Sequence, residues 1–398
     1  MTVLGAPLEF CLFGLTLLGV AILHHRTLEV ALVGLASILI YQGVWGAFPT
    51  GEGLAALGQH ALHEWVILTN ILLLLVGFGL LANQFELSGL PDHMPGVLPD
   101  SWLGGLAMLA IVFVLSAFLD NIAAAIIGGV MARHLYKGRV SVGFLASIVA
   151  AANAGGAGSV IGDTTTTIMW LKGVAPLEVI PAYVACLAAF AVFGVAGALS
   201  QQRYQPILKH DEPGHPIHWR RVVIVGVVLT AAIAANIAAN LLSPGEASAP
   251  WLGLAVWAAL LATSLIARPD WTVAQSSLKG ALFLVALVAA ASLMPVNALP
   301  DPSWQTAFGL GVVSSVFDNI PLTALALEQG GYDWGLLAYA VGFGGSMLWF
   351  GSSAGVALTN LYPEGRSVGA WLRQGWHVPV AYVAGFFVMF GLLGWRPG

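Results

Sequence analysis

Long apolar runs are the feature of this chain that most restricts its fold. Several stretches reach the roughly 20 residues that a helix needs to cross the hydrocarbon core of a bilayer. Charged residues make up only 8% of the 398 residues, against about 25% in a typical soluble domain. No polar segment is long enough to form a separate soluble domain. The sequence therefore predicts an all-α polytopic membrane protein.

About ten transmembrane helices are expected from these runs. Their predicted bounds are residues 8–23, 28–48, 65–82, 140–172, 178–200, 220–241, 250–267, 278–296, 333–361 and 371–395. Glycine and proline are abundant, with 48 and 20 copies, which suits membrane helices that pack closely and break at defined points.

Two further apolar segments, 101–136 and 303–329, are expected to form re-entrant helical hairpins. The first has 36 residues and would reach about 54 Å as one helix, against a hydrocarbon core of about 30 Å. Asp120 and Asn121 lie near its middle. Irregular backbone at that depth is tolerated only where protein surrounds it or where it lines a cavity. A hairpin that turns at Asp120 therefore fits better than a single crossing.

The distribution of basic residues supports the hairpin. When the loop 201–221 is taken as cytoplasmic, twelve of the 14 Lys and Arg residues fall on that side, as the positive-inside rule expects. Only Lys172 and Arg396 fall outside. Reading 101–136 as one crossing would move Lys137 to the opposite side from Arg203. Both chain termini are then predicted to lie outside.

Two motifs occur in the same order in both halves of the chain. SAFLDNI at 116–122 returns as SSVFDNI at 314–320, and NAGGAGSVIGDTTTT at 153–167 is followed in the second half by GFGGSMLWFGSSAG at 342–355. In this register the aligned pairs are Gly155 with Gly344, Gly156 with Gly345, Gly162 with Gly351, Asp163 with Ser352 and Thr164 with Ser353. The order of the two motifs predicts an internal repeat.

The repeat divides the chain into two inverted units. Residues 1–200 are expected to hold scaffold helices, the hairpin 101–136 and a broken helix at 140–172. Residues 201–221 are expected to form a cytoplasmic linker, and 222–398 to hold the hairpin 303–329 and a broken helix at 333–361. Each unit has five crossings, and an odd number inverts the second unit. Paired broken helices in two repeats are typical of the binding site of a secondary transporter.

Three carboxylates are the strongest candidates for the site. Asp120, Asp163 and Asp318 lie far from the ends of their apolar segments, and no Lys or Arg lies in the same apolar core. A lone carboxylate in hydrocarbon is costly, so each must be protonated, bind a cation or face water. The alternative reading is that each Asp only caps a hairpin or helix turn. The neutral oxygen donors expected beside them are Asn121, Asn153, Thr164, Thr165, Asn319, Ser352 and Ser353.

These motifs resemble the sodium/proton antiporters of the NhaD type, in a larger ion transporter superfamily with arsenite pumps and citrate carriers. NAGGAGSVIGDTTTT is similar to that family's NAGGAWSPIGD-plus-threonines stretch. The resemblance implies ion-site carboxylates at Asp120, Asp163 and Asp318, with a Na⁺ site among them. The chain departs from the family at Ala123, Ala124 and Ala125, where relatives carry threonines.

The expected function is exchange of cytoplasmic Na⁺ or Li⁺ for external protons. A Na⁺- or H⁺-coupled carrier of anions such as dicarboxylates or arsenite-like oxyanions is the alternative. A channel is disfavoured by the paired breaks, and no catalytic constellation indicates an enzyme. No cofactor is expected beyond the transported ions. Membrane lipid and small ions are the expected partners, without nucleic acid, and a homodimer is left open. The resemblance implies a bacterial inner-membrane location.

Overall fold

The computed structural model is almost entirely helical, in agreement with the predicted fold class. It describes residues 2–3, 6–23, 26–45, 47–48, 51–90, 98–117, 119, 121–160, 162–163, 165–166, 169, 174–207, 216–242, 249–294, 300–317 and 319–398. Two short antiparallel ribbons, β1 (Thr2–Val3) with β2 (Ala6–Pro7) and β3 (Ala47–Phe48) with β4 (Gly51–Glu52), are the extended elements of this part of the chain.

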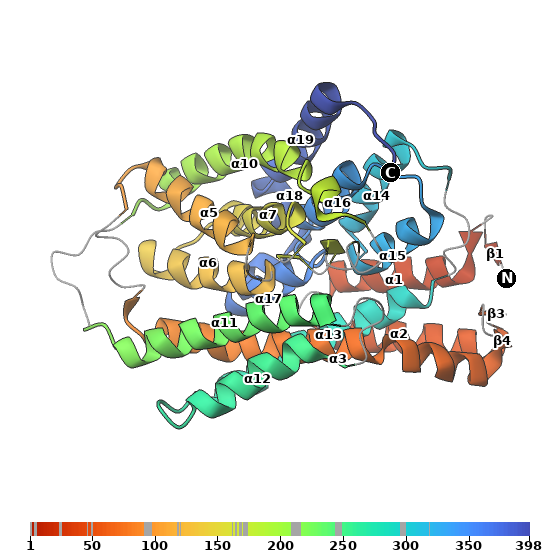
Figure 1. Ribbon diagram of the computed structural model, residues 1–398, viewed down its shortest axis with the longest axis horizontal. Helices are drawn as coiled ribbons and strands as arrows, with labels where there is room; N and C mark the ends of the chain where they lie inside the picture. The colour runs from red at the N-terminus through yellow and green to blue at the C-terminus, as the bar shows by residue number, and fades with distance from the viewer. Residues whose placement is uncertain are drawn as a thin grey trace.

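Helices occupy both halves of the chain (Figure 1). The first half contains α1 (Leu8–Ile22), α2 (Thr27–Trp45), α3 (Gly53–Glu86), α5 (Trp102–Ser116), α6 (Asn121–Leu135), α7 (Val142–Ala157), α9 (Pro176–Val179) and α10 (Ala182–Tyr204). The second half contains α11 (Trp219–Leu242), α12 (Trp251–Thr263), α13 (Trp271–Ser292), α14 (Trp304–Ser314), α15 (Asn319–Gln329), α16 (Trp334–Gly344), η1 (Gly345–Met347), α17 (Ser353–Leu361), η2 (Pro363–Arg366), α18 (Val368–Gln374) and α19 (His377–Leu393).

Several of these helices can cross a bilayer. In the part of the chain that the structure describes, four helices are long and apolar enough, at Thr27–Trp45, Gly53–Phe85, Pro176–Tyr204 and Trp271–Ala290. A fifth candidate is the pair α18 and α19, which meet at an angle of 59°. The span expected at 371–395 is therefore bent, with Gly375 and Trp376 between its two helices. Shorter apolar helices of 10–17 residues lie at Leu8–Val20, Trp102–Ser116, Asn121–Leu135, Val142–Ala157 and Trp251–Thr263.

The segment 101–136 enters and leaves the bundle at the same end, as expected of a hairpin. The Gln202 side chain donates to the carbonyl of Asp100 (3.2 Å), just before α5. The Gln201 side chain donates to the carbonyl of Arg139 (3.0 Å) and accepts from Ser141 N–H (2.8 Å), just after α6. Both arms of the hairpin therefore have their bases beside the C-terminal end of α10.

The second hairpin has its base at the other end of the bundle. Gln329, the last residue of α15, donates to the carbonyl of Pro300 ahead of α14 (2.9 Å). Gly398 N–H donates to the carbonyl of Tyr332 (3.0 Å), so the C-terminus lies at this end too. The segment α9 leads into α10 and packs against α16, which begins here. The 23 residues of α10 thus separate the two hairpin bases by about 35 Å.

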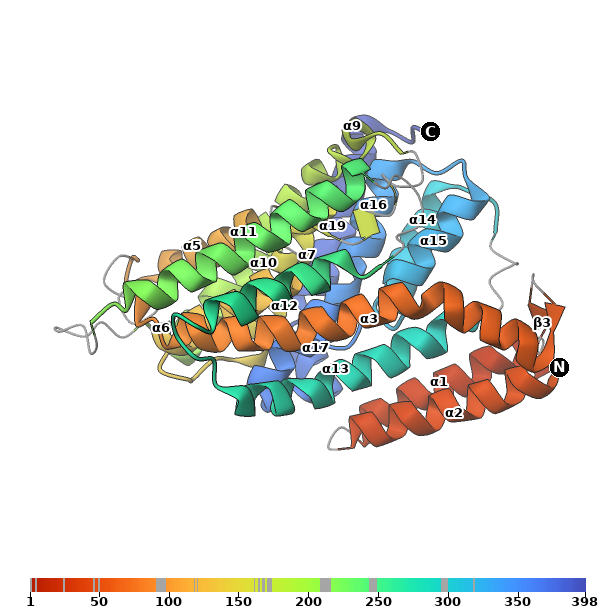
Figure 2. The same ribbon diagram turned by 60° about the horizontal axis from the view of Figure 1, so that its bottom comes forward.

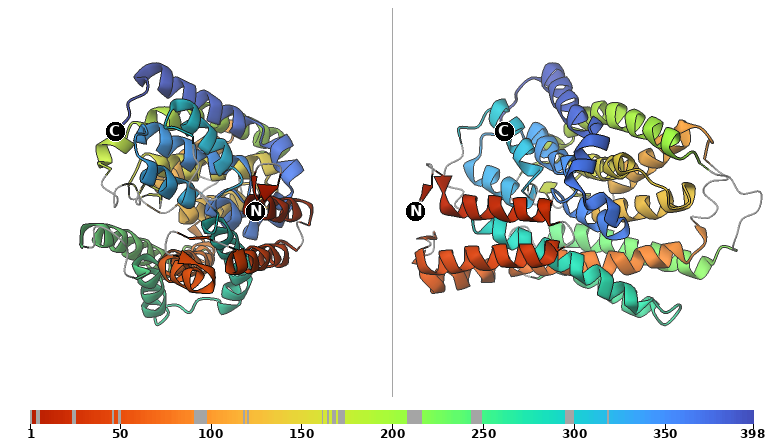
Figure 3. Two further views of the ribbon diagram at one scale, coloured as in Figure 1. Left: turned by 90° about the vertical axis from the view of Figure 1, so that its right-hand side faces the viewer. Right: turned by 180° about the vertical axis from the view of Figure 1, so that it is seen from behind.

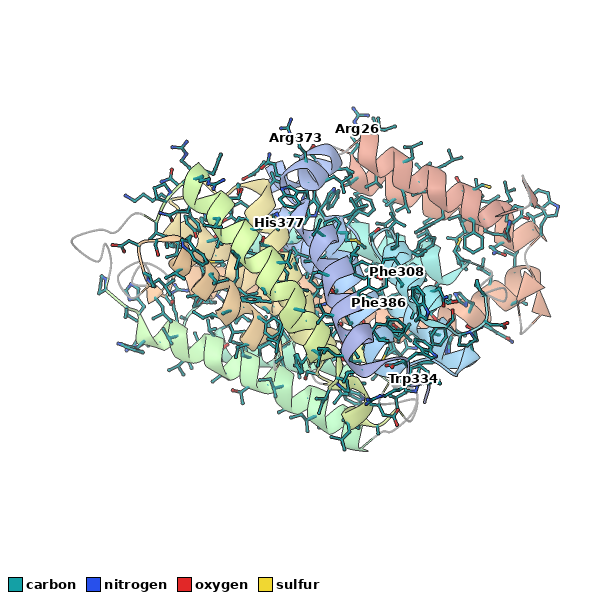
Figure 4. The ribbon with its side chains drawn as sticks, turned by 90° about the horizontal axis from the view of Figure 1, so that it is seen from above. Arg26, Phe308, Trp334, Arg373, His377 and Phe386 are labelled. Carbon is teal, nitrogen blue, oxygen red and sulfur yellow. The ribbon has the colours of Figure 1, made fainter. Side chains whose placement is uncertain are left out.

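The two hairpins consequently point toward one another from opposite ends (Figure 1). Figure 4 shows Arg26 and Arg373 at one edge of the molecule and Trp334 at the opposite edge. Figure 2 shows α3, α11, α12 and α13 side by side on the outside of the bundle, where α3 packs against the other three. Seen end-on, the early red and middle green helices lie below the yellow and blue ones (Figure 3).

Equivalent hydrogen bonds hold each hairpin to its broken helix. Ser116 Oγ donates to the carbonyl of Ala152 (2.5 Å) in the first half. Ser314 Oγ donates to the carbonyl of Val341 (2.7 Å) in the second. Both residues of each pair correspond in the register that the two motifs define, so the same bond occurs at the same place in each half.

Equivalent glycines allow this close packing. A Cβ at Gly155 would collide with the carbonyl oxygen of Phe113, and a Cβ at Gly344 would collide with that of Gly311. Since these two collisions correspond in the same register, α7 approaches α5 as α16 approaches α14. Glycine is needed at these positions because no side chain fits between the helix and the neighbouring backbone.

Candidate functional site

The first broken helix places Asp163 at the start of a new helical turn. The helix α7 ends at Ala157, and helical structure resumes at Thr165. Asp163 Oδ1 accepts from the backbone N–H and from the hydroxyl of Thr165, each at 3.2 Å. This is the geometry of an N-cap, in which a short polar side chain satisfies free N–H groups at a helix start. Only 3% of Asp163 is exposed, so the structure buries this carboxylate.

The second broken helix repeats this arrangement with a serine. The helix α16 ends at Gly344, η1 follows, and Ser352 caps the N-terminus of α17 by accepting from Gly355 N–H (3.4 Å). Ser352 is fully buried. Asp163 and Ser352 therefore correspond in position and in capping role, as predicted. At this position the first half carries a carboxylate and the second half an uncharged hydroxyl.

Glycines also set the distance across each break. A Cβ at Gly156 would lie 3.0 Å from Asp163 Cβ and 2.9 Å from the carbonyl oxygen of Gly162. In the second half, a Cβ at Gly345 would lie 3.1 Å from Ser352 Cβ. The end of one helix therefore meets the start of the next without space for a side chain, which fixes the capping residue beside the break.

A buried amide joins the two halves. Asn153 in α7 accepts from Asn121 Nδ2 at the start of α6 (3.1 Å). Its own Nδ2 donates to Ser346 Oγ (2.9 Å) and to Ser352 Oγ (3.1 Å) in the second half. Asn153, Ser346 and Ser352 are fully buried, and Asn121 is 5% exposed. This group of four polar side chains, the amide–serine network, links the first hairpin to both broken helices.

The carboxylate of Asp163 also lies against the second half. A Cβ at Gly342 in α16 would be 3.3 Å from Asp163 Oδ2, and the same position contacts Ala157. The absence of a side chain at Gly342 thus leaves room for the carboxylate beside the facing helix. Charge from the first half and backbone from the second meet at this point.

The structure brings several of the predicted site residues together. It joins Asn121, Asn153 and Ser352 through hydrogen bonds, and it pairs Asp163 with Thr165. Asn319 and Ser353 are buried at the starts of α15 and α17. The predicted site residues Asp120, Thr164 and Asp318 lie outside the described residues.

Ser346 belongs to this network, although the sequence motifs did not predict it as a site residue. Its equivalent in the first half is Ala157, so the motif comparison marks it as a position where only one half carries an oxygen. Trp371 Nε1 donates to the carbonyl of the same serine (3.3 Å). The signal in the sequence that could have indicated Ser346 is therefore a hydroxyl that one repeat carries and the other lacks.

The donor set of the site is oxygen, with one carboxylate and several neutral groups. Hard cations prefer carboxylate, amide and hydroxyl oxygens. Among the described residues, no three His, Cys, Asp or Glu side chains gather as they would around a transition metal. The arrangement suits a small, hard monovalent cation, or a proton on Asp163.

The apolar helices, the opposed hairpins and the buried polar breaks define a polytopic membrane protein of the transporter type. No family model matches the chain. Sodium/proton antiporter 1 of Arabidopsis thaliana is 29% identical over 289 residues, which are 63% of this chain and 49% of that protein. The chain thus spans about half the length of this relative. Sodium/proton antiporter 2 of the same plant is 27% identical, covering 65% of this chain and 69% of the relative.

A bacterial relative gives the same result. The Na⁺/H⁺ antiporter NhaD of Vibrio parahaemolyticus is 29% identical over 311 residues, which are 65% of this chain and 72% of that protein. The chain is therefore similar to sodium/proton antiporters, including one of the NhaD type.

Proposed function

We propose that this protein exchanges Na⁺ or Li⁺ for protons through a site at the two helix breaks. The observation that carries the proposal is the buried Asp163 carboxylate at the first break, which faces Gly342 of the second half, where a Cβ would lie 3.3 Å from Asp163 Oδ2. The names of the three relatives support the same activity. A buried carboxylate between two halves of a membrane bundle is a group on which a cation and a proton can compete.

The mechanism is competition for the same charge. Ionised Asp163 binds a dehydrated cation, with Asp120 or Asp318 and the neutral oxygens of the network completing its shell. When the site opens to the outside, protons displace the cation and neutralise the carboxylates. Loaded forms carry little net buried charge, so they cross the hydrocarbon more cheaply than the empty, ionised form.

Alternating access follows from the two opposed hairpins. The hairpins and broken helices move as one group against the outer helices, as in transporters built from inverted repeats. The proposed repeats are residues 1–200 and 222–398, joined by a cytoplasmic linker at 201–221. The proposed location is a bacterial inner membrane with both termini outside, and the partners are membrane lipid and the transported ions.

The test is cation-driven proton movement in everted membrane vesicles. Respiration or ATP hydrolysis establishes an acid interior, and a pH-sensitive dye reports its collapse when Na⁺, Li⁺ or K⁺ is added. The expected result is dequenching with Na⁺ or Li⁺ that vesicles without the protein do not show. Vesicles that contain normal amounts of protein and respond to none of these cations would reject the proposal.

An anion carrier is the second candidate, and one observation favours it. Trp349 lies between η1 and α17, and its Nε1 is buried without a hydrogen-bond partner among the described residues. An indole N–H can only donate, so it suits an anion rather than a cation. Uptake of a labelled dicarboxylate or arsenite, driven by a Na⁺ or proton gradient in the same vesicles, would support this alternative.

A further inference from the structure

Thr323 in α15 has a buried hydroxyl that makes no hydrogen bond within the part of the chain that the structure describes. The residue is fully buried, and its Oγ1 has no hydrogen-bond partner among the described residues. Buried polar groups are nearly always satisfied, so this hydroxyl requires a reason. The usual fate of a threonine in a helix is a bond to a backbone carbonyl three or four residues earlier.

Other threonines of this protein follow that usual pattern. Their Oγ1 atoms donate to carbonyls in their own helices: Thr16 to Leu12 (2.8 Å), Thr230 to Gly226 (2.8 Å), Thr263 to Ala259 (2.7 Å) and Thr359 to Val356 (3.1 Å). Thr323 therefore differs from threonines in comparable helical positions. Its oxygen remains available for a ligand that is not part of the chain.

Helical spacing places Thr323 on the same face as Asn319. The two residues are four positions apart, and residues with this spacing lie one above the other on a helix. Leu322 and Ala326 are also buried and complete the same stripe. Asn319 begins α15 directly after the hairpin tip, so the Thr323 hydroxyl lies one helical turn from the tip, on the buried side.

The first half has no oxygen at the corresponding position. Asn319 aligns with Asn121, and Thr323 therefore aligns with Ala125. Ala125 is fully buried in α6. The neutral oxygens of the two hairpins are thus unequal, with a hydroxyl in the second hairpin where the first carries a methyl group.

We propose that Thr323 Oγ1 is a ligand for the transported cation and that the second hairpin holds the tighter of the two half-sites. The hydroxyl offers lone pairs to a small cation and, with the Asn319 side-chain oxygen on the same face, replaces part of its hydration shell. This inference rests on the proposed cation/proton exchange and specifies which of the two hairpins contributes more to the affinity for the ion.

The experiment compares three variants of the full-length protein in vesicles and in detergent. Thr323→Val removes the hydroxyl and keeps the shape of the side chain. Thr323→Ser keeps the hydroxyl and removes the methyl group. Thr263→Val is the matched control, because Thr263 is buried in the outer helix α12 and already bonds Ala259. Each variant is assayed for the half-saturating Na⁺ and Li⁺ concentrations, for the maximal rate, and for thermal stabilisation by NaCl over choline chloride.

The expected result is a rise of about fivefold or more in half-saturating Na⁺ for Thr323→Val, the usual effect of losing one ligand. The maximal rate should change less, and the stabilisation by NaCl should shrink because it follows the affinity. Thr323→Ser should keep a half-saturating Na⁺ concentration and a stabilisation by NaCl close to those of the unmodified protein. Thr263→Val should match the unmodified protein in both quantities.

Two outcomes would overturn the inference. One is an unchanged half-saturating Na⁺ and an unchanged stabilisation by NaCl in Thr323→Val. The other is an equal change in the Thr263→Val control, which would assign the effect to packing. If Thr323→Val does not fold, the stabilisation by NaCl in Thr323→Ser and Thr323→Ala decides, since only the alanine variant should lose it. Absence of cation-driven proton movement in the unmodified protein is a different result, because it rejects the proposed exchange while the NaCl stabilisation still reports binding.

Discussion

Asn153 donates a 2.9 Å hydrogen bond to Ser346, a residue 193 positions later in the chain. Both side chains are fully buried. The bond joins α7 of the first half to the chain just after α16 of the second, beside both helix breaks. If the two halves separate when the site opens to the other side of the membrane, this bond must break, and if they move together, it is kept. A substitution of Asn153 should therefore affect both the stability and the rate of exchange.

The first prediction concerns this asparagine. Asn153→Ala removes the acceptor of Asn121 and the donor to two serines, so it should destabilise the protein by several times the ~1 kcal/mol of one hydrogen bond and slow exchange. The measurements are the melting temperature in detergent and the rate of dye dequenching. Ser346→Ala leaves the Ser352 bond in place and should have the smaller effect. Equal effects of the two variants would contradict the central role of the amide.

The second prediction concerns charge at the first break. Asp163→Asn keeps an oxygen that can cap Thr165 but removes the negative charge, so cation-driven proton movement should be lost while the protein still inserts. The readout is vesicle dequenching at matched expression. Ser352→Ala is the informative partner, because it alters the equivalent cap of the second half, whose capping side chain is uncharged, and should leave measurable exchange. Retained exchange in Asp163→Asn would remove this residue from the path of the proton.

The third prediction concerns the glycine contacts. Gly155→Ala and Gly344→Ala should each destabilise the protein, because the added methyl meets the carbonyl oxygen of Phe113 or Gly311. Overpacking of this kind typically costs about 1–3 kcal/mol. Gly309→Ala in α14 is the control, since a Cβ there has open space around it. Melting temperatures in detergent provide the comparison. Unchanged melting temperatures in Gly155→Ala and Gly344→Ala would show that the helices can move apart without a loss of stability.

The fourth prediction concerns the membrane topology. Lys137 and Arg203 should be labelled from the same, cytoplasmic side, because Gln201 bonds Arg139 and Ser141 at one end of the bundle. Single cysteines at positions 137 and 203, in a background without Cys11 and Cys186, are treated with an impermeant reagent in intact cells and in everted vesicles. Reaction of the two positions from opposite sides would be incompatible with the first hairpin.

Much of this architecture follows from the sequence because it depends on local chemistry. An apolar run that is too long and contains Asp120 and Asn121 must turn, and the described ends of the segment 101–136 do lie together. The glycine register was predictable as well, because a repeated close contact requires a repeated glycine. Asp163 and Ser352 occupy equivalent caps for the same reason.

Other features depend on packing between distant segments and were not predictable. The helix α3 begins at Gly53 rather than near residue 65. Its added turns meet neighbouring helices, because His60 lies 3.0 Å from Ser292 Oγ in α13 and a Cβ at Gly43 in α2 would lie 3.1 Å from Leu54. The bend between α18 and α19 occurs where the Gly375 N–H bonds the carbonyl of Trp371 (2.7 Å). The bond of Asn153 to Ser346 crosses between halves, so no local pattern could reveal it.

The paired glycine contacts have a consequence for how this protein can change over evolutionary time. Each broken helix packs against its hairpin backbone to backbone, so a side chain cannot be added at Gly155 or Gly344 without displacing a helix. Substitutions at these two glycines should therefore be rejected more often than exchanges of side chains that do not lie between the two backbones. Ser346 aligns with Ala157, and Thr323 aligns with Ala125, so the two halves differ in oxygen at these positions while sharing the glycines. An engineer can thus add or remove single oxygens at such positions to vary the proposed ion site while leaving the glycine contacts unchanged.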